Sequence, residues 1–278
     1  MRQRFSLQSV VPATVMGILN VTPDSFADGG KYDSLSMAVN SAMQMEASGA
    51  GIIDIGGEST RPGAATVSEA EELMRVIPVI EQIRKQSDIP ISIDTSKTEV
   101  MRTALDVGAD MINDVNALQA EGAIEVAVEY QVPVCLMHMQ GTPRDMQLQP
   151  SYQDVVDDVM EFLQKRTDTC VASGLKIEEI ALDPGFGFGK NTAQNYQLFA
   201  SLSRFVKTNQ PVLVGVSRKS MLGAVVDKQV DLRLAASIAA ATMAAELNVH
   251  LLRVHDVEET VDAMKIVNAV REAKSQIK

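Results

Sequence analysis

Residues 52–63 of the chain are Ile52-Ile-Asp-Ile-Gly-Gly-Glu-Ser-Thr-Arg-Pro-Gly63. The β-branched run predicts a buried strand, and the paired glycines with the polar residues behind them predict a loop at its end. Glycine lets the backbone approach a ligand closely, while Ser59, Thr60 and Arg61 offer hydroxyls and a guanidinium that suit an anion. On its own, the stretch is explained equally well as an ordinary turn closed by a surface arginine. The same arrangement recurs along the whole chain, which favours a binding loop.

Short apolar runs alternate with amphipathic helical patterns throughout the sequence, as in βα units that build a parallel sheet. Two helix starts fit a capping box, Ser68 with Glu71 and Ser96 with Glu99. The predicted strands are residues 15–19, 52–55, 91–93, 111–112, 134–137, 180–182, 212–216 and 251–254. The predicted helices are residues 35–48, 68–87, 97–107, 123–130, 154–173, 192–207, 232–248 and 257–275.

This organisation predicts one α/β domain over residues 1–278, a single (β/α)8 TIM barrel with its site at the C-terminal ends of the strands. No linker rich in Pro, Gly or Ser divides the sequence, and no close internal repeat stands out. An open doubly wound sheet is the alternative, but it needs a G-x-G-x-x-G turn that opens a helix after an early strand. The glycines between residues 185 and 189 lie late in the chain and lack that spacing.

Composition and charge narrow the classes of function. Hydrophobic residues make up 46% of the chain and tryptophan is absent, which suits an aliphatic core under parallel strands. The formal net charge of −11 argues against a nucleic-acid or anionic-membrane surface, because such binding needs a basic field. An anionic ligand must therefore be held by cations gathered at one place.

Cysteine use and the start of the sequence bear on location. Cys135 and Cys170 lie in a predicted buried strand and a predicted helix, without the spacing of a zinc site or a redox pair, so we expect reduced core thiols. Residues 1–14 lack the apolar centre of a signal peptide, and no apolar run is long enough to span a bilayer. We therefore expect a cytoplasmic protein.

Polar residues stand at nearly every predicted strand end. The C-terminal ends of barrel strands meet on one face, so residues far apart in sequence converge there. Each has an ordinary explanation as a cap or a satisfied core histidine, but a barrel needs no polar ring in order to close. The set therefore favours a binding face. Its members in strand order are Asn20, Arg61, Asp94, Asn113 with Asp114, His138, Asp183, residues 217–219, and Arg253 with His255.

The polar ring divides by charge into two expected subsites. One combines amide, hydroxyl and cationic groups that suit a phosphate or a diphosphate. Its members are Asn20, Thr60, Arg61, Arg253 and His255. The other suits a heterocycle with adjacent amino and ring N–H groups, because buried carboxylates need donors. Its members are Asp94, Asn113 and Asp183, with Lys219 between the two subsites and Phe26, Pro62 and Phe188 as apolar walls for a flat ring.

At these residues the chain resembles the dihydropteroate synthases of the folate pathway, and the resemblance runs from Met16 to about Met264. Four motifs match in order, which is a more specific signal than any one of them. They are Met16-Gly-Ile-Leu-Asn-Val-Thr-Pro-Asp-Ser-Phe26, Asp54-Ile-Gly-Gly-Glu-Ser-Thr-Arg-Pro-Gly63, Asp183-Pro-Gly-Phe-Gly-Phe-Gly-Lys190 and Ser217-Arg-Lys-Ser220. A small departure is Ala27, where bacterial members often carry serine.

The resemblance implies that the chain joins 6-hydroxymethyl-7,8-dihydropterin diphosphate to 4-aminobenzoate. It further implies Mg2+ as cofactor, sulfonamides as inhibitors and a homodimer. By motif position it assigns pterin binding to Asp94, Asn113, Asp183 and Lys219. It assigns diphosphate binding to Asn20, Thr60, Arg61, Arg253 and His255, with Asn20 also as the ligand of Mg2+. It assigns aminobenzoate binding to Phe26, Pro62, Phe188, Ser217 and Lys219.

We expect a dissociative reaction, because diphosphate leaves from a methylene on an electron-rich ring and positive charge develops on the pterin. Asp94, Lys219 and Arg61 are the expected catalytic residues, with Asp94 stabilising the cation. The loops after the first two strands would exclude water. The aminobenzoate nitrogen then attacks, so the protein needs no covalent nucleophile.

Two other classes of function are weighed against this one. A pterin-binding barrel module of corrinoid methyl transfer would share the carboxylate subsite, but it has no need of Arg61 or of Arg253 with His255. A metal-dependent hydrolase barrel is disfavoured, because the three histidines of the chain form no H-x-H pair.

Overall fold

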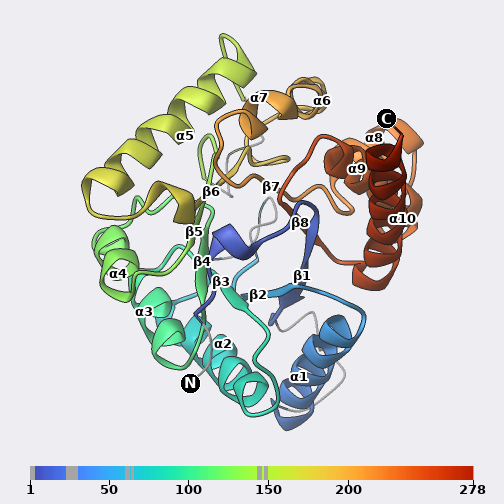
Figure 1. Ribbon diagram of the computed structural model, residues 1–278. Coiled ribbons are helices and arrows are strands. Elements are labelled where there is room, and N and C mark those ends of the chain that lie inside the picture. Colours follow the sequence, from blue (N-terminus) through green and yellow to red (C-terminus); the bar gives the residue numbers. More distant parts are fainter. Residues whose placement is uncertain are drawn as a thin grey trace.

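The computed structural model, which describes residues 4–22, 31–59, 63, 66–142, 146 and 150–277, is a barrel of parallel strands surrounded by helices (Figure 1). The eight strands pair in the order β6-β5-β4-β3-β2-β1-β8-β7. Val212 bridges back to Leu182 of β6, which closes the ring. The strands are β1 (Thr14–Asn20), β2 (Ile52–Gly56), β3 (Ile91–Asp94), β4 (Met111–Asp114), β5 (Val134–Met137), β6 (Ile180–Asp183), β7 (Leu213–Val214) and β8 (Leu251–Val254). The predicted (β/α)8 barrel is confirmed.

The helices follow the predicted alternation with two differences. The helix predicted at 192–207 divides at Ser201 into two, and a short helix after β7 was not predicted, because seven residues are too few to show a helical period. The helices are α1 (Lys31–Ala47), α2 (Glu69–Arg84), α3 (Thr98–Asp106), α4 (Ala123–Tyr130), α5 (Val155–Ala172), α6 (Thr192–Ala200), α7 (Leu202–Val206), α8 (Ser220–Val226), α9 (Leu234–Glu246) and α10 (Val257–Gln276). Short 3₁₀ turns are η1 (Leu7–Ser9), η3 (Ile177–Glu179) and η4 (Val230–Leu232).

One of the two predicted helix caps is wrong. Ser68 caps α2, because its hydroxyl accepts a hydrogen bond from the Glu71 amide. The cap predicted at Ser96 does not form, since α3 begins at Thr98 and its cap residue makes no side-chain bond. The helix starts one residue later than the pattern S-x-x-E requires, so the serine lies outside the cap position.

Two apolar layers hold the barrel together. Side chains that point outward from the strands pack under the helices, as Ile53, Ile93 and Leu252 do. Side chains that point inward at the start of the strands fill the barrel, where Leu7 of η1 packs against them from below. This inner layer consists of Met16, Ile52, Met111, Cys135, Ala181, Leu213 and Leu251. The N-terminal end of the barrel is therefore closed, and the free thiol of Cys135 is a buried core group, as expected.

The next inward position on each strand lies two residues further along, because strand side chains alternate between faces. At that position the apolar layer gives way to polar groups. They are Asp54 on β2, Asp94 on β3, Asn113 on β4, Asp183 on β6 and Arg253 on β8. Strand alternation alone thus places three carboxylates, an amide and a guanidinium on the inner wall at the carboxyl end of the barrel.

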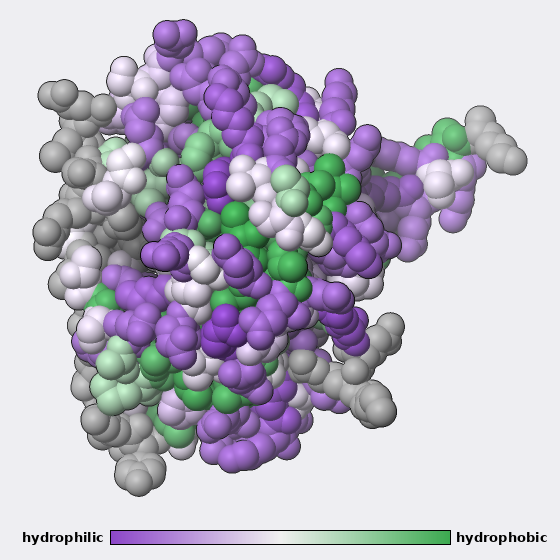
Figure 2. Space-filling model, turned by 90° about the vertical axis from the view of Figure 1, so that its left-hand side faces the viewer, coloured by the Kyte–Doolittle hydropathy of each residue, from purple (hydrophilic) through white to green (hydrophobic). Residues whose placement is uncertain are grey.

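The outer surface formed by the helices on the left of Figure 1 is mainly hydrophilic, with hydrophobic residues in small groups (Figure 2). It suits helices that bury one face only, as α3 does with Val100, Met101, Ala104 and Leu105. In the described part of the chain no helix is long and apolar enough to cross a membrane.

Candidate active site

Arg253 joins three strands at the carboxyl end of the barrel. Its Nε donates to Asp54 Oδ2 at 2.6 Å, and its Nη2 donates to Asp94 Oδ2 at 2.5 Å. Asn113 Nδ2 donates to the same Asp54 oxygen at 3.1 Å. Asp54 is fully buried, whereas the Asp94 side chain keeps 11% and Arg253 20% of its surface exposed. The guanidinium therefore spans two carboxylates, of which only Asp94 reaches the open rim.

One positive charge shared by two carboxylates leaves negative charge in excess. The pKa of Asp94 is raised to about 7, chiefly by burial, with Arg253 opposing the rise and the carboxylates of Asp54 and Asp114 adding to it. Burial works to lower the pKa of Arg253, but the carboxylates of Asp54 and Asp94 outweigh it and raise this pKa, so the guanidinium stays charged. Asp54 Oδ1 is buried and has no hydrogen-bond partner among the described residues. The negative charge of ionised Asp94 is therefore only partly neutralised in the protein, so a second cation beside it would be stabilised.

Asp183 and Lys219 form a second buried pair of charges. Asp183 Oδ1 accepts from the Gly185 amide at 2.7 Å. Burial raises the pKa of Asp183, and Lys219 is the largest opposing influence. Burial lowers the pKa of Lys219 to about 8, with Asp183 working against it. Lys219 donates to the Phe186 carbonyl and lies 4.7 Å from the centre of the Phe188 ring, so it borders both the carboxylate and an aromatic wall.

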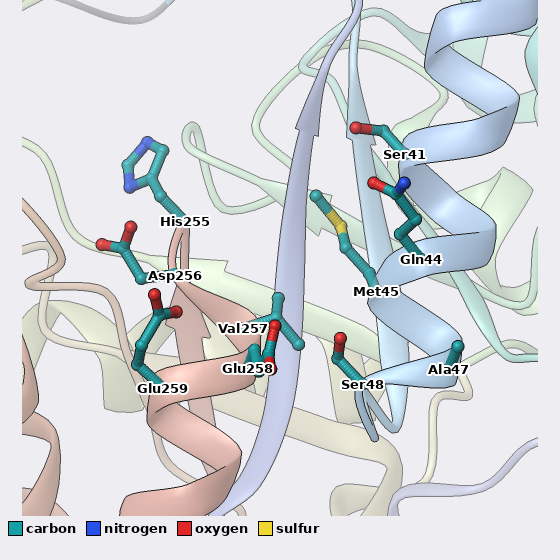
Figure 3. A pocket seen from close by; sticks show the side chains of 10 residues that line it. All are labelled: Ser41, Gln44, Met45, Ala47, Ser48, His255, Asp256, Val257, Glu258 and Glu259. Carbon is teal, nitrogen blue, oxygen red and sulfur yellow. The ribbon is translucent and has the colours of Figure 1, made fainter.

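Ser217 links the end of β7 to the end of β8. Its hydroxyl accepts from the His255 backbone amide at 3.2 Å and lies 3.1 Å from His255 Nδ1. On its outer side His255 borders a cavity of about 600 Å³ between α1 and the start of α10 (Figure 3). This cavity is lined by Asp256, Glu258 and Glu259, so it is unsuited to an anion. An anion would meet His255 only from the barrel side.

The structure gathers most of the predicted site residues and leaves four outside the described residues. Phe26, Thr60, Arg61 and Pro62 are these four. Asn20 ends β1, half-buried, with Gly56 of β2 as its register partner. Direct contacts join Asp94 with Arg253, Asn113 with Asp54, Ser217 with His255, and Lys219 with Phe188, while Asp183 and Lys219 interact through their charges.

The two subsites expected from the sequence are not separate. Arg253 was expected among the anion-binding groups, yet it pairs with Asp94 of the carboxylate subsite. The strand ends are known from sequence, but the reach of a side chain across the inside of a barrel is not. Arg253 on β8 and Asp94 on β3 meet through the lumen although β1 and β2 lie between them in the sheet.

Sequence reasoning missed Asp54 as a site residue. A signal was present, because Asp54 is the one charged residue in an otherwise apolar strand, and it lies two positions after the inward-facing Ile52. It also missed the partners of Glu58, which receives Lys97 Nζ at 2.5 Å and the Val67 amide at 3.0 Å. Glu58 thereby ties together both ends of the segment 59–66, and nothing in the sequence pattern indicates this contact.

A barrel whose inner rim carries paired carboxylates, an amide and buried cations defines an enzyme that binds a donor-rich ring beside an anion. The family model described as pterin binding enzyme matches residues 16–255. The dihydropteroate synthase of Haemophilus influenzae is 53% identical over 259 residues, which cover 93% of this chain and 94% of that relative.

Two solved structures are similar in three dimensions. The Yersinia pestis dihydropteroate synthase in a sulfonamide complex gives a TM-score of 0.90 at 50% identity, with 96% of both chains covered. The Xanthomonas albilineans dihydropteroate synthase in complex with 7,8-dihydropteroate gives 0.86 at 44% identity, covering 96% of this chain and 95% of that one. The chain therefore belongs to the pterin-binding enzymes and, within them, to the dihydropteroate synthase family. Its activity is the joining of a dihydropterin methyl diphosphate to 4-aminobenzoate in folate biosynthesis.

Asp94→Asn should separate activity from stability. We expect turnover to fall roughly 100-fold or more, because a charge aimed at the developing cation is lost. The raised pKa of Asp94, about 7 against 3.8 when exposed, means that its ionisation lowers stability progressively as the pH rises from about 4 to about 7, and the full cost is present at pH 8. The free energy of unfolding at pH 8 should therefore stay level or rise, by roughly 1–3 kcal/mol. Steady-state kinetics and urea unfolding test both effects, and full turnover with normal pterin binding would contradict the assigned role.

Proposed function

We propose that the chain forms 7,8-dihydropteroate by a dissociative route in which the rim stabilises separated charge. The observation that carries this is the sharing of Arg253 between Asp54 and Asp94. A cation that forms beside Asp94 meets a carboxylate already short of positive charge, so the site is complementary to the transition state before substrate arrives. No reorganisation is needed at the moment of reaction.

The pterin is held by buried acceptors that face its donor edge. Asp183 has one oxygen engaged with the Gly185 amide, which leaves the rest of its acceptor capacity for the amino and ring N–H groups of the pterin. Asn113, oriented by its bond to Asp54, offers an amide that both donates and accepts. Lys219 lies beside these acceptors, and its positive charge offsets the negative charge of Asp183. A donor-rich ring satisfies these buried groups where an apolar ring would leave them unpaired.

The departing diphosphate is received by Arg253 and His255, together with Thr60 and Arg61 of the loop after β2. No described residue accepts a hydrogen bond from Arg253 Nη1, which leaves this group available to an anion while Nε and Nη2 stay bound to the carboxylates. The His255 ring is fixed by Ser217. These groups bind the leaving group, and the loops after β1 and β2 exclude the water that would otherwise capture the cation.

The aminobenzoate enters beside Phe188, Ser217 and Lys219, with Phe26 and Pro62 as the remaining walls. The Phe188 ring lies under the Lys219 ammonium, and this combination suits a flat ring that carries a carboxylate. A sulfonamide of similar shape and charge would compete at the same place, in line with the sulfonamide complex of the Yersinia pestis relative.

Turnover of the purified chain with pterin diphosphate, 4-aminobenzoate and Mg2+ should yield dihydropteroate, which a corrinoid-type binding module or a hydrolase barrel would not make. Phe188→Ala should raise the KM for 4-aminobenzoate roughly tenfold or more, because most of an aromatic contact is lost. The KM for the pterin substrate should change less than about threefold. Val225→Ala, at an exposed position of α8, serves as the control. Equal changes in both KM values for Phe188→Ala would count against the pocket.

Mg2+ is proposed as the cofactor, with Asn20 as its protein ligand. Among the described residues no group of three or more His, Cys, Asp or Glu side chains could hold a metal ion. A half-buried amide oxygen at the rim nevertheless fits Mg2+, because this ion keeps several waters and is usually bound through one or two protein oxygens plus substrate phosphates. When bound, it would supply positive charge to the leaving diphosphate.

Removal of Mg2+ by chelation should therefore abolish turnover and leave the fold intact. Asn20→Ala should raise the Mg2+ concentration for half-maximal turnover roughly tenfold, because the amide oxygen is gone. Asn20→Asp retains an oxygen ligand and should stay closer to the unchanged protein. Titration of turnover with Mg2+ measures both, and an unaltered requirement in Asn20→Ala would remove this residue from the metal site.

The proposal for the whole molecule is a cytoplasmic homodimer of a single domain, residues 1–278. Both cysteines are buried free thiols, which suits a reducing compartment. The neighbouring helices α9 and α10 expose Met243, Ile266 and Val270, although α9 packs its alanine face inward (Figure 1).

These three residues support a contact between two copies. Met243→Lys should therefore lower the sedimentation coefficient from that of a dimer to that of a monomer, because a charge is placed in an apolar contact. Met74→Lys, on α2 and at least as exposed, is the matched control. A monomer for the unchanged protein would reject the dimer.

A further inference from the structure

Lys190 is a buried lysine whose amino group contacts backbone carbonyls and His138, and it is not among the expected substrate-binding residues. It ends the segment 184–190 after β6, and only 2% of its surface is exposed. Its Nζ lies 2.8 Å from the Gly185 carbonyl and 2.9 Å from the Phe188 carbonyl. The same atom lies 3.2 Å from the His138 carbonyl and 3.0 Å from His138 Nδ1. One ammonium therefore binds both ends of the segment that carries Phe188, and anchors it to the end of β5.

This segment fits tightly against the backbone that follows β5. A Cβ at Gly185 would lie 1.9 Å from the His138 carbonyl oxygen, and one at Gly189 would lie 2.5 Å from the Gln140 carbonyl oxygen. Both glycines have positive φ, so the close approach and the turn require glycine. The path of the chain from 185 to 189 is thus set by close contact with the backbone of His138 and Gln140, which follow β5, and its carbonyl groups at Gly185 and Phe188 are the ones that meet Lys190.

The outer side of the segment is held by two more side chains. The Tyr152 hydroxyl donates to the Gly189 carbonyl at 2.7 Å. Asn195 of α6 accepts from the Gly187 amide at 2.7 Å and donates to the Lys190 carbonyl at 3.1 Å. These contacts fix Gly187 and Gly189, whereas Gly185 and Phe188 are held from inside by Lys190.

His138 is suited to be an acceptor for this ammonium. Burial, together with the charge of Lys190, lowers the pKa of His138 to about 3, so the ring stays neutral and Nδ1 can keep a free lone pair. The ring packs edge-on against Phe162 at 5.0 Å and against Tyr152 at 5.9 Å. An ammonium has three donors, and here it finds three carbonyls and one imidazole nitrogen, so all of its donors are satisfied.

We propose that Lys190 is a positioning residue for 4-aminobenzoate, which acts by holding the Phe188 carbonyl so that the Phe188 ring stays under Lys219. This inference rests on the proposed aminobenzoate pocket at Phe188. Lys219 also donates to the Phe186 carbonyl, so the segment is held by hydrogen bonds from two lysines, Lys190 and Lys219. Without Lys190, the inward carbonyls of Gly185 and Phe188 lose their donor, and the turn between them can relax.

The test compares Lys190→Met, which keeps the length of the side chain and removes its donors, with Arg271→Met. Arg271 also donates to a backbone carbonyl, that of Ala245 near the end of α9. Lys190→Met should raise the KM for 4-aminobenzoate at least fivefold while the KM for pterin diphosphate changes less than twofold. Arg271→Met should lower the unfolding temperature and leave both KM values unchanged. Loss of stability without the split in KM for Lys190→Met would overturn the proposal.

A second pair of variants keeps Lys190 and changes its acceptor, in case Lys190→Met does not fold. His138→Asn can place an oxygen near the position of Nδ1, whereas His138→Leu keeps bulk without an acceptor. The proposal expects the aminobenzoate KM to rise in His138→Leu and to be largely restored in His138→Asn, and equal values in the two variants would overturn it.

Phe188→Ala separates this inference from the proposed pocket. If Phe188→Ala leaves the aminobenzoate KM unchanged, the pocket itself is misplaced and the role of Lys190 falls with it. If Phe188→Ala raises that KM and Lys190→Met does not, the pocket stands and only the positioning role is lost.

Discussion

The site depends on one guanidinium that two buried carboxylates share. Arg253 spans Asp54 and Asp94 across the inside of the barrel, and Asn113 supports the same arrangement from β4. Burying these charges is costly, and a pairing of one cation with two anions does not remove the whole cost. The barrel tolerates it because the apolar layer below and the helices around it supply the stability. What remains is an excess of negative charge at this pair of carboxylates, beside the place where a cation is proposed to form.

The alternation of side chains along each strand decides which residues fill the barrel and which line the site above the filled layer. Ile52 and Asp54 differ by two positions, as do Met111 and Asn113, Ala181 and Asp183, and Leu251 and Arg253, so on these four strands an apolar side chain of the lower layer has a polar one above it. The lower layer closes the barrel with the help of Leu7, and the upper layer opens to solvent. A shift of one residue in any of these strands would turn its inward side chains out under the helices and its outward side chains into the barrel, so register and chemistry are fixed together.

The sequence predicts the barrel well because every strand and most helices carry their own periodic signal. It locates the site residues at strand ends, since the convergence of those ends is a property of the fold. It does not reveal which of them touch. Arg253 meets Asp94 because side chains cross the lumen, and Lys190 meets His138 because Gly185 brings two backbones together, and neither contact leaves a trace in a linear pattern. The short α8 and the break at Ser201 were missed for a simpler reason, since segments of five to seven residues show no period.

The charge balance of the described inner rim bears on how a diphosphate could bind there. Three carboxyl groups, Asp54, Asp94 and Asp183, lie beside three basic groups, Arg253, Lys219 and Lys190, and burial raises the pKa of Asp94 to about 7 and lowers that of Lys190 to about 7. These described groups therefore provide no surplus of positive charge. The whole chain carries a net charge of −11, which also opposes an arriving diphosphate. A neutral pterin ring meets no net charge at such a rim, whereas its diphosphate does not find surplus positive charge there. In the proposed reaction, added positive charge would come from Arg61, which follows β2, and from the Mg2+ that accompanies the diphosphate.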